Sequence, residues 1–430
     1  MLIWSRFAGI TVLQLIRRKE MHREVAAELQ GHLEDLVAQL QEEGINRDRA
    51  EEEACHRLGE PGLLGRELDR IHRPRLNWGL FLTVMLAAAG GLFALAIAPG
   101  KRPGDIWFQG GVALAGLVLT LLAPYFDYRL LVRYKTPLYI AGLALVVLDF
   151  RLPGGAYFPA SVGLAAALCF LVVSLASLVV LLEKEPSWAL RAKTWGLCLL
   201  PVVLLIMGHT VVWAVVLGGT LLAMFRGAGF SRIKIIAGLV AGLLAAFLYL
   251  ATLAPPYITT RLLYGWLKPL ADPTSAGYLL LTIRQHLAAG GTFGAGIGND
   301  QAALLPPLPE ASRELILAPV MQQTGWPGGL ILMTFLLALL LFLFRAFNRT
   351  DDLYGRVLGY GITAFLGIRF AWNTAMIFGL LPLAGIGLPF VSYGPSFLAL
   401  DFCLVALALN ITARQPGRVL IPDGGGNDPI

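Results

Sequence analysis

The stretch WNTAMIFGLLPLAGIGLPFVSYGPSFLAL, residues 372–400, joins one long apolar run of the chain to the next. Its second half is rich in glycine and proline and carries serine and tyrosine, a composition for which a lipid-facing helix has no obvious use. Irregular backbone at membrane depth is tolerated only where it packs on protein or lines a watery cavity. The stretch therefore predicts a polar pocket at the mouth of a transmembrane helix.

The composition of the whole chain is that of a membrane protein. Of its 430 residues, 57% are hydrophobic and only 14% are charged, whereas a soluble domain carries about 25% charged residues. The mean hydropathy is +0.68. These values predict an all-α, polytopic membrane protein. The net charge of +6 fits Lys- and Arg-rich cytoplasmic loops, so no nucleic-acid partner is expected.

Residues 1–75 have a different pattern and predict a small soluble helical bundle. Apolar residues at helical spacing alternate with charges over 22–44, and further helices are expected over 48–59 and 63–72. The segments HLEDLVAQLQEEG (32–44) and RLGEPGLLGREL (57–68) resemble the permease-prefix domains that precede some bacterial membrane proteins. That resemblance implies a regulatory or interaction element rather than an active site.

From residue 76 to 413 the hydropathy pattern predicts about ten membrane segments. They lie near 76–99, 107–126, 136–150, 159–182, 190–207, 209–225, 233–253, 327–347, 357–381 and 390–412. Basic residues gather in alternate loops and in the tail, residues 414–430, which places both termini in the cytoplasm. Residues 254–326 then form one long loop outside the membrane. Within it, TIRQHLAA and SRELILAPVMQQ have the spacing of short helices on either side of a glycine cluster.

Charged side chains in the long loop are the candidates for chemistry. Arginines such as Arg261 and Arg284 can pair with phosphate oxygens. A carboxylate beside them, such as Glu314, can act as a general base or hold a divalent ion. Taken alone, each of these charges also fits an ordinary solvated or interfacial loop residue.

Several collinear motifs resemble those of the SEDS family, the FtsW/RodA/SpoVE group. Residues 372–400 are similar to its signature, and GGTFGAGIGN (290–299) and LPEASRELILAPVMQQTGWPGG (308–329) are similar to stretches of its long loop. The resemblance covers most of residues 76–413. It implies a multi-pass protein of the bacterial cytoplasmic membrane that polymerises lipid II into peptidoglycan at the outer face of that membrane, usually with a class B penicillin-binding protein.

The resemblance also implies roles for individual residues. Glu314 falls at the family's essential aspartate, as base or as ligand of a divalent cation, Mg²⁺ or Mn²⁺. Pyrophosphate would be held by Arg261 and Arg284. The signature places further candidate substrate contacts at Ser392 and Tyr393.

Departures from the family pattern bear on activity. They include a longer acid at Glu314, amides at Gln322–Gln323, an arginine at Arg369 and a proline at Pro395. The family's Gln-Pro-Ser-Glu stretch is replaced at 158–161, the lysine after it is apolar near Leu164, and its Pro-Asp-x-Gly stretch has no clear counterpart around MGHTVVW. An arginine inside a membrane helix faces a cavity or pairs with a buried group. Arg369 is therefore expected either to line the substrate pocket or to pair with a carboxylate such as Asp401.

Three functions stay open on the sequence. The first is an active peptidoglycan glycosyltransferase serving cell shape, division or sporulation. The second, suggested by the departures and the added N-terminal bundle, is a non-catalytic paralogue that scaffolds or regulates cell-wall synthesis. The third is a lipid transporter that uses the same cavity, although the chain shows no convincing internal repeat.

Overall fold

The structure is a computed structural model that describes residues 22–57, 62–63, 66, 76–102, 104–151, 160–185, 187–208, 210–298 and 305–414. These residues form helices and connecting segments and contain no strand. The chain divides into two compact units, Met1–Arg75 with Arg414–Ile430, and Leu76–Ala413. Most of the predicted third N-terminal helix, and the predicted tail beyond Arg414, lie outside the described residues.

The described part of the first unit is a pair of helices, α3 (His22–Glu42) and α4 (Arg47–Arg57). Apolar residues at helical spacing give each helix a buried stripe, and the two stripes meet in a small core of Leu33, Leu40, Ala50 and Ala54. The turn between the helices contains Gly44 at φ 87. Glycine adopts this left-handed conformation without a Cβ clash, which is why it commonly follows the last turn of a helix.

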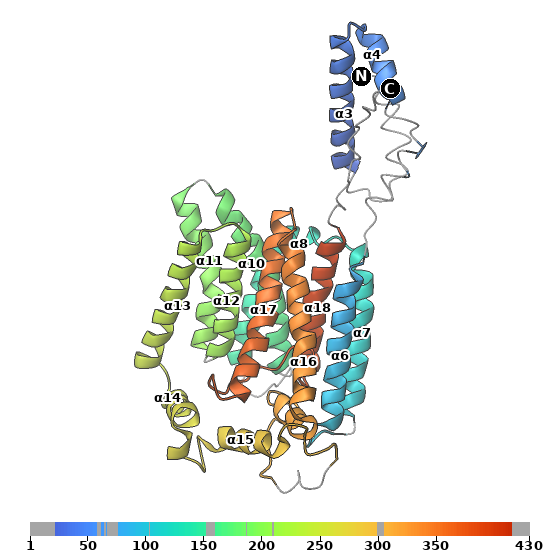
Figure 1. Cartoon of the computed structure of the whole chain (residues 1–430). Coiled ribbons are helices and arrows are strands. Elements are labelled where there is room, and N and C mark those ends of the chain that lie inside the picture. Colours follow the sequence, from blue (N-terminus) through green and yellow to red (C-terminus); the bar gives the residue numbers. More distant parts are fainter. Residues whose placement is uncertain are drawn as a thin grey trace. The chain divides into compact units, whose positions relative to one another are not determined.

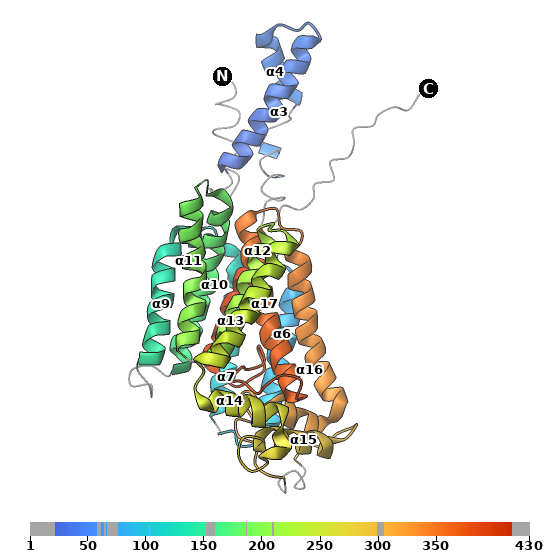
Figure 2. The same ribbon diagram turned by 90° about the vertical axis from the view of Figure 1, so that its left-hand side faces the viewer.

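The described residues of the second unit form ten long helices that correspond one by one to the ten predicted membrane segments (Figures 1 and 2). They are α6 (Trp78–Ile97), α7 (Asp105–Leu122), α9 (Lys135–Arg151), α10 (Ala160–Lys184), α11 (Trp188–Met207), α12 (Val211–Gly227), α13 (Arg232–Thr252), α16 (Leu317–Phe347), α17 (Leu353–Ile377) and α18 (Pro395–Ala413). Two short turns, η3 (Ala123–Tyr125) and α8 (Leu130–Arg133), link α7 to α9. Seven of the ten helices are long and apolar enough to cross a membrane by length and composition alone, and α12 is a shorter apolar helix. The chain is therefore an integral membrane protein, and the predicted all-α polytopic fold is confirmed.

Burial divides the ten helices into a central and a peripheral set. In the central helices α10 and α18, 67% of the most apolar window is buried, and the two helices contact each other. Gly116 of α7 allows close contact with α18, because a Cβ there would lie 2.2 Å from the Phe402 ring. In α13 only 6% of the window is buried, so this helix presents nearly its whole surface to lipid.

The long loop between α13 and α16 folds into short helices at one end of the bundle. These are α14 (Pro256–Leu262), a π-helical turn η4 (Leu263–Leu267), a 3-10 turn η5 (Pro269–Ala271) and α15 (Tyr278–Gly290). Figures 1 and 2 both show α14 and α15 at the same end of the unit. The helix predicted over TIRQHLAA is part of α15, which packs on α16.

The start of α16 differs from the prediction. Residues 309–316 are turns, and the helix predicted over SRELILAPVMQQ begins only at Leu317. It then runs into the membrane segment through a non-helical residue, Gly325 (φ 69, ψ −164). A Cβ on Gly325 would lie 2.4 Å from the Thr292 carbonyl oxygen, so glycine at this kink lets the glycine-rich loop pack directly on the backbone of α16.

Candidate active site

Glu314 lies in the turn segment that leads into α16, and a side chain of α17 holds its backbone in place. The Asn373 Nδ2 group donates hydrogen bonds to the carbonyl oxygen of Glu314 at 2.7 Å and to that of Ile386 at 2.6 Å. Asn373 has no exposed surface. Because both carbonyls are bound by one buried amide, the Glu314 turn and the loop after α17 are tied together.

The Glu314 carboxylate is half-buried and lies against Gly385. A Cβ at residue 385 would be 3.1 Å from Glu314 Oε1, so the absence of a side chain there leaves room for glutamate. Burial raises the pKa of Glu314 above its ordinary value, and the nearby charge of Glu310 raises it further. Arg261 and Arg313 act in the opposite direction. The extra methylene of glutamate is thus accommodated, and the carboxylate has the environment of a tuned acid–base group.

The two candidate phosphate-binding arginines lie on the long loop at different distances from Glu314. Arg261, at the end of α14, is close enough for its charge to affect the pKa of Glu314. Arg284, on α15, lies beside Gly379, where a Cβ would be 3.4 Å from Arg284 Nη2. Both side chains are exposed. The charge of Arg261 therefore acts on Glu314, whereas Arg284 lies by the loop after α17.

Ser392 and Tyr393 connect the signature loop to its neighbours. The Ser392 hydroxyl accepts a hydrogen bond from the backbone N–H of Leu388 at 2.7 Å. The backbone N–H of Tyr393 donates to the Ser312 carbonyl at 2.8 Å, and its hydroxyl donates to Asp105 Oδ1 at 2.9 Å. Both side chains are only partly exposed. These residues fix the signature loop against the Glu314 turn, and their direct contact with substrate stays a prediction.

Arg369 forms a buried ion pair with Asp401, and each of the two side chains is only 1% exposed. Its guanidinium is surrounded by three aromatic rings, those of Trp213, Phe365 and Phe397, with centroids 5.5–5.9 Å away. The second Asp401 oxygen accepts from the Phe390 backbone N–H at 3.0 Å. Of the two alternatives from the sequence, pairing with Asp401 is confirmed. Arg369 supports the signature loop from within the bundle and has almost no surface left for a substrate.

Two other departures from the family pattern have structural roles. Pro395 is the first residue of α18, where its missing N–H removes no helical hydrogen bond. Gln322 Oε1 lies 2.7 Å from His286 Nδ1, and Gln323 Nε2 donates to the Ile97 carbonyl at 2.8 Å. These amides hold α15 and the end of α6 to the start of α16. The departures are therefore compatible with an ordered site.

Polar residues at the N-terminal end of α7 complete the candidate site but were not predicted from the sequence. Gln109 Nε2 donates to the Ser392 carbonyl at 3.1 Å, and Asp105 accepts from Tyr393 as described above. Asp105 and Gln109 are four residues apart, so they lie on one face of the helix. Two polar residues spaced four apart in an otherwise apolar segment were the sequence feature from which these site residues could have been predicted.

Acidic groups that could hold a cation are few in the described part of the chain. No group of three or more His, Cys, Asp or Glu side chains lies together there. Glu310 is the carboxylate whose charge acts on the candidate base Glu314, and its Oε2 also forms an ion pair with Arg313 Nη1 at 3.4 Å. Mg²⁺ is commonly bound by one or two carboxylates together with substrate phosphates. Glu314 and Glu310 would supply those carboxylates, and the substrate would supply the remaining oxygen ligands.

Comparison with known proteins gives consistent matches. The family model FtsW/RodA/SpoVE, described as "Cell cycle protein", matches residues 164–416. A probable peptidoglycan glycosyltransferase FtsW of Geobacter metallireducens is 30% identical over 325 residues, which is 72% of this chain and 85% of the relative. Stage V sporulation protein E of Bacillus subtilis is 32% identical over 160 residues, covering 37% of this chain and 43% of that protein.

Solved structures show the same fold. One matching chain comes from a structure described as "Structural coordination of polymerization and crosslinking by a peptidoglycan synthase complex". The match has a TM-score of 0.61 at 24% identity, and it covers 78% of this chain and 97% of the matching chain. The rod shape determining protein RodA of Thermus thermophilus has a TM-score of 0.55 at 22% identity, with 78% and 96% covered. At these identities the likeness concerns the fold.

Proposed function

Because the chain belongs to the FtsW/RodA/SpoVE family, we propose that it is a peptidoglycan glycosyltransferase that polymerises lipid II in cell-wall synthesis. The observation that carries this is the half-buried Glu314 carboxylate, which has a raised pKa and lies close enough to Arg261 and Arg313 to feel their charges. Because its pKa is raised, this carboxylate is a stronger base than an ordinary glutamate, which suits a proton acceptor. The names of the relatives, probable peptidoglycan glycosyltransferases, support the same reaction.

In the proposed reaction Glu314 is the general base. It accepts the proton of the acceptor sugar hydroxyl, whose oxygen attacks the anomeric carbon of the donor while the bond from that carbon to the pyrophosphate breaks. The departing lipid pyrophosphate carries negative charge, and Arg261 with Arg284 would stabilise it. Asn373 keeps the Glu314 turn in register with the signature loop. Ser392 and Tyr393 border the same region as candidate substrate contacts.

A divalent cation, Mg²⁺ or Mn²⁺, is also part of the proposal. Glu314 and Glu310 are the side chains that would hold it together with substrate phosphate oxygens. When bound, it would neutralise charge that develops on the leaving pyrophosphate.

The membrane topology follows from the distribution of basic residues. We expect both termini in the cytoplasm, which places the long loop and Glu314 on the outer face of the bacterial cytoplasmic membrane. Lipid II would reach the site from the bilayer. A class B penicillin-binding protein is the proposed partner, in line with the peptidoglycan synthase complex that has the same fold.

The second candidate function is a non-catalytic scaffold for cell-wall synthesis. The observation favouring it is that Gln322 is used for a buried contact with His286 where the family has an acid.

The test is polymerisation of labelled lipid II by the purified full chain with Mg²⁺ or Mn²⁺. Glycan chains from the wild type, lost in Glu314→Ala and kept in the control Asp351→Ala, support catalysis. Absence of chains from the wild type, with a synthase still bound, supports the scaffold.

A further inference from the structure

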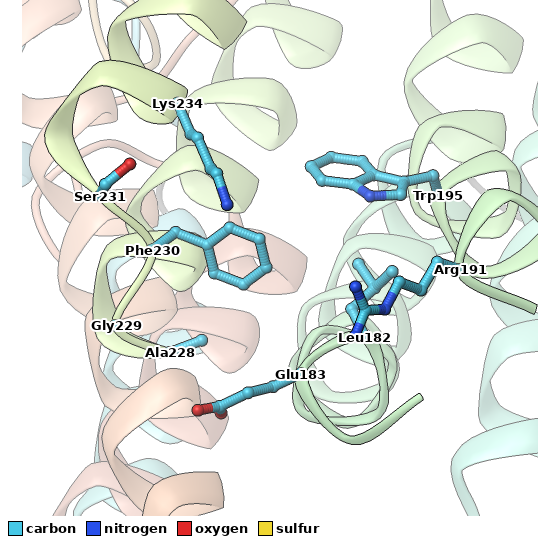
Figure 3. A pocket seen from close by; sticks show the side chains of 9 residues that line it. All are labelled: Leu182, Glu183, Arg191, Trp195, Ala228, Gly229, Phe230, Ser231 and Lys234. Carbon is cyan, nitrogen blue, oxygen red and sulfur yellow. The ribbon is translucent and has the colours of Figure 1, made fainter. Parts of the chain in front are cut away.

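A cavity of about 560 Å³ lies between the α10–α11 turn and the α12–α13 turn. The α13 helix runs from this cavity at Arg232 to Thr252, where the long loop begins, so the cavity is at the opposite end of that helix from the loop that bears Glu314. Figure 3 shows the residues around it, which are Leu182, Glu183, Arg191, Trp195, Ala228, Gly229, Phe230, Ser231 and Lys234. None of them belongs to the proposed active site.

Two cationic side chains approach the cavity from opposite walls (Figure 3). The Lys234 ammonium lies 5.8 Å from the centroid of the Phe230 ring. Arg191 is anchored through its Nε, which donates to the Glu185 carbonyl at 2.7 Å, and its terminal nitrogens have no partner among the described residues. Neither cation forms an ion pair in the described part of the chain. With Glu183 as the one acidic lining residue, the cavity has an excess of positive charge.

The N-terminus of α13 adds to this positive field. Ser231 precedes the helix and lines the cavity, and its side chain makes no capping hydrogen bond. The first N–H groups of a helix and the positive end of its dipole favour an anion, and α13 is 21 residues long. The cavity thus combines two cations with a helix N-terminus, a combination suited to phosphate.

The same cavity has an apolar side that continues along α13. Trp195 packs on Phe225 with ring centroids 4.6 Å apart and meets Phe230 edge-on at 6.3 Å. From the cavity, α13 presents exposed apolar side chains along the membrane: Ile233 (79%), Ile236 (59%) and Val240 (58%). A ligand that fills this site needs an anionic head and a long apolar part.

We propose that this cavity binds the phosphate of an anionic membrane phospholipid. Arg191 and Lys234 contact the phosphate, the aromatic wall packs on the glycerol region, and the acyl chains lie along the exposed face of α13. Arg232 and Lys193 are exposed on the same two helices but do not line the cavity, so they have no direct part in this site. This binding does not depend on the proposed polymerisation activity, and its test uses no lipid II.

The test is native mass spectrometry of the full chain in detergent, titrated with short-chain phosphatidylglycerol. We expect at least tenfold weaker binding in Arg191→Gln/Lys234→Gln. Lys193→Gln/Arg232→Gln is the matched control, since it removes two positive charges from the same helices but outside the cavity. It is expected to change binding less than twofold. Phosphatidylcholine of equal chain length should bind at least tenfold more weakly than phosphatidylglycerol.

A third variant is expected to bind the lipid more strongly, a result that misfolding cannot produce. Glu183→Gln removes the acidic lining residue, so it should strengthen phosphatidylglycerol binding. Equal losses in the two double variants, weaker binding in Glu183→Gln, or equal affinity for the two lipids would overturn the proposal. Displacement of the lipid by equimolar inorganic phosphate or glycerol phosphate would also overturn it, because it would assign the cavity to a soluble anion.

Discussion

Replacing Asn373 by alanine should slow lipid II polymerisation by displacing Glu314. The substitution removes the Nδ2 group that donates to the carbonyls of Glu314 and Ile386 at 2.7 and 2.6 Å. The Asn373 side chain and its bond to the Ile386 carbonyl are fully buried, and the bond to the Glu314 carbonyl is partly buried, so water has little access to replace the lost donors. The Glu314 turn and the loop after α17 then lose their shared anchor.

The expected size of the effect follows from these two bonds. Leaving a buried carbonyl without a donor costs about 1–3 kcal/mol, so Asn373→Ala should lower the free energy of unfolding by roughly 2–6 kcal/mol. A catalytic group displaced by about 1 Å loses about 100-fold in rate. We therefore expect a polymerisation rate about two orders of magnitude below the wild type.

The chain offers a matched control at Asn410. Its Nδ2 donates to the carbonyls of Ala123 and Phe126, both at 2.6 Å, and the side chain is 1% exposed. Asn410 lies near the C-terminal end of α18, whereas the signature loop leads into the N-terminal end of that helix. Asn410→Ala should lower thermal stability to a similar extent and leave the rate per folded molecule within a few fold of the wild type.

The assay measures chain formation from labelled lipid II and thermal unfolding on the same preparations. The reasoning about Asn373 would be refuted if Asn373→Ala lost stability but kept the wild-type rate. It would also be refuted if both alanine variants lost activity equally, since general destabilisation would then explain the result.

Three further predictions concern the charge of Glu314 and the support of the signature loop. The polymerisation rate should rise as the pH passes through the raised pKa of Glu314, because a general base acts only when it is deprotonated. In pH–rate profiles, Arg313→Gln should move the midpoint to higher pH and Glu310→Gln should move it to lower pH. Shifts in the opposite directions would contradict the assignment of Glu314 as the base. Arg369→Met should cost about 3–5 kcal/mol in unfolding experiments by leaving Asp401 unpaired, and Arg369→Met/Asp401→Leu should recover much of this; a double variant no more stable than the single one would count against it. Gly91→Ala should lower the free energy of unfolding by about 1–3 kcal/mol, because its Cβ would lie 2.2 Å from the Phe390 carbonyl oxygen. Gly111→Ala, which has open space around it, should leave the stability unchanged. Equal melting temperatures for the two variants would contradict this prediction.

The hydropathy pattern was sufficient to predict the ten long helices, because each apolar run is bounded by charged or turn-forming residues. It could not predict the form of α16. The kink at Gly325 depends on contact with Thr292, which lies in another part of the long loop. Such a contact between segments leaves no periodic signal in the sequence.

The candidate site was predicted as a set of residue types, and its connections were not. Tyr393 meets Asp105 across a separation of 288 residues, and Asn373 reaches Glu314 across 59. Hydrogen bonds of this kind depend on how the helices pack. Arg369 shows the same limit, since the sequence allowed either a pocket or a buried pair, and only the packing of α17 against α18 distinguishes them.

The most direct measurement is polymerisation of labelled lipid II by the purified wild type, Glu314→Ala and Glu314→Asp in the presence of Mg²⁺ or Mn²⁺. Our account predicts glycan chains from the wild type, a loss of about 10²–10⁴-fold in Glu314→Ala, and retained activity in Glu314→Asp, which keeps the carboxylate. Normal polymerisation by a folded Glu314→Ala variant would contradict the account.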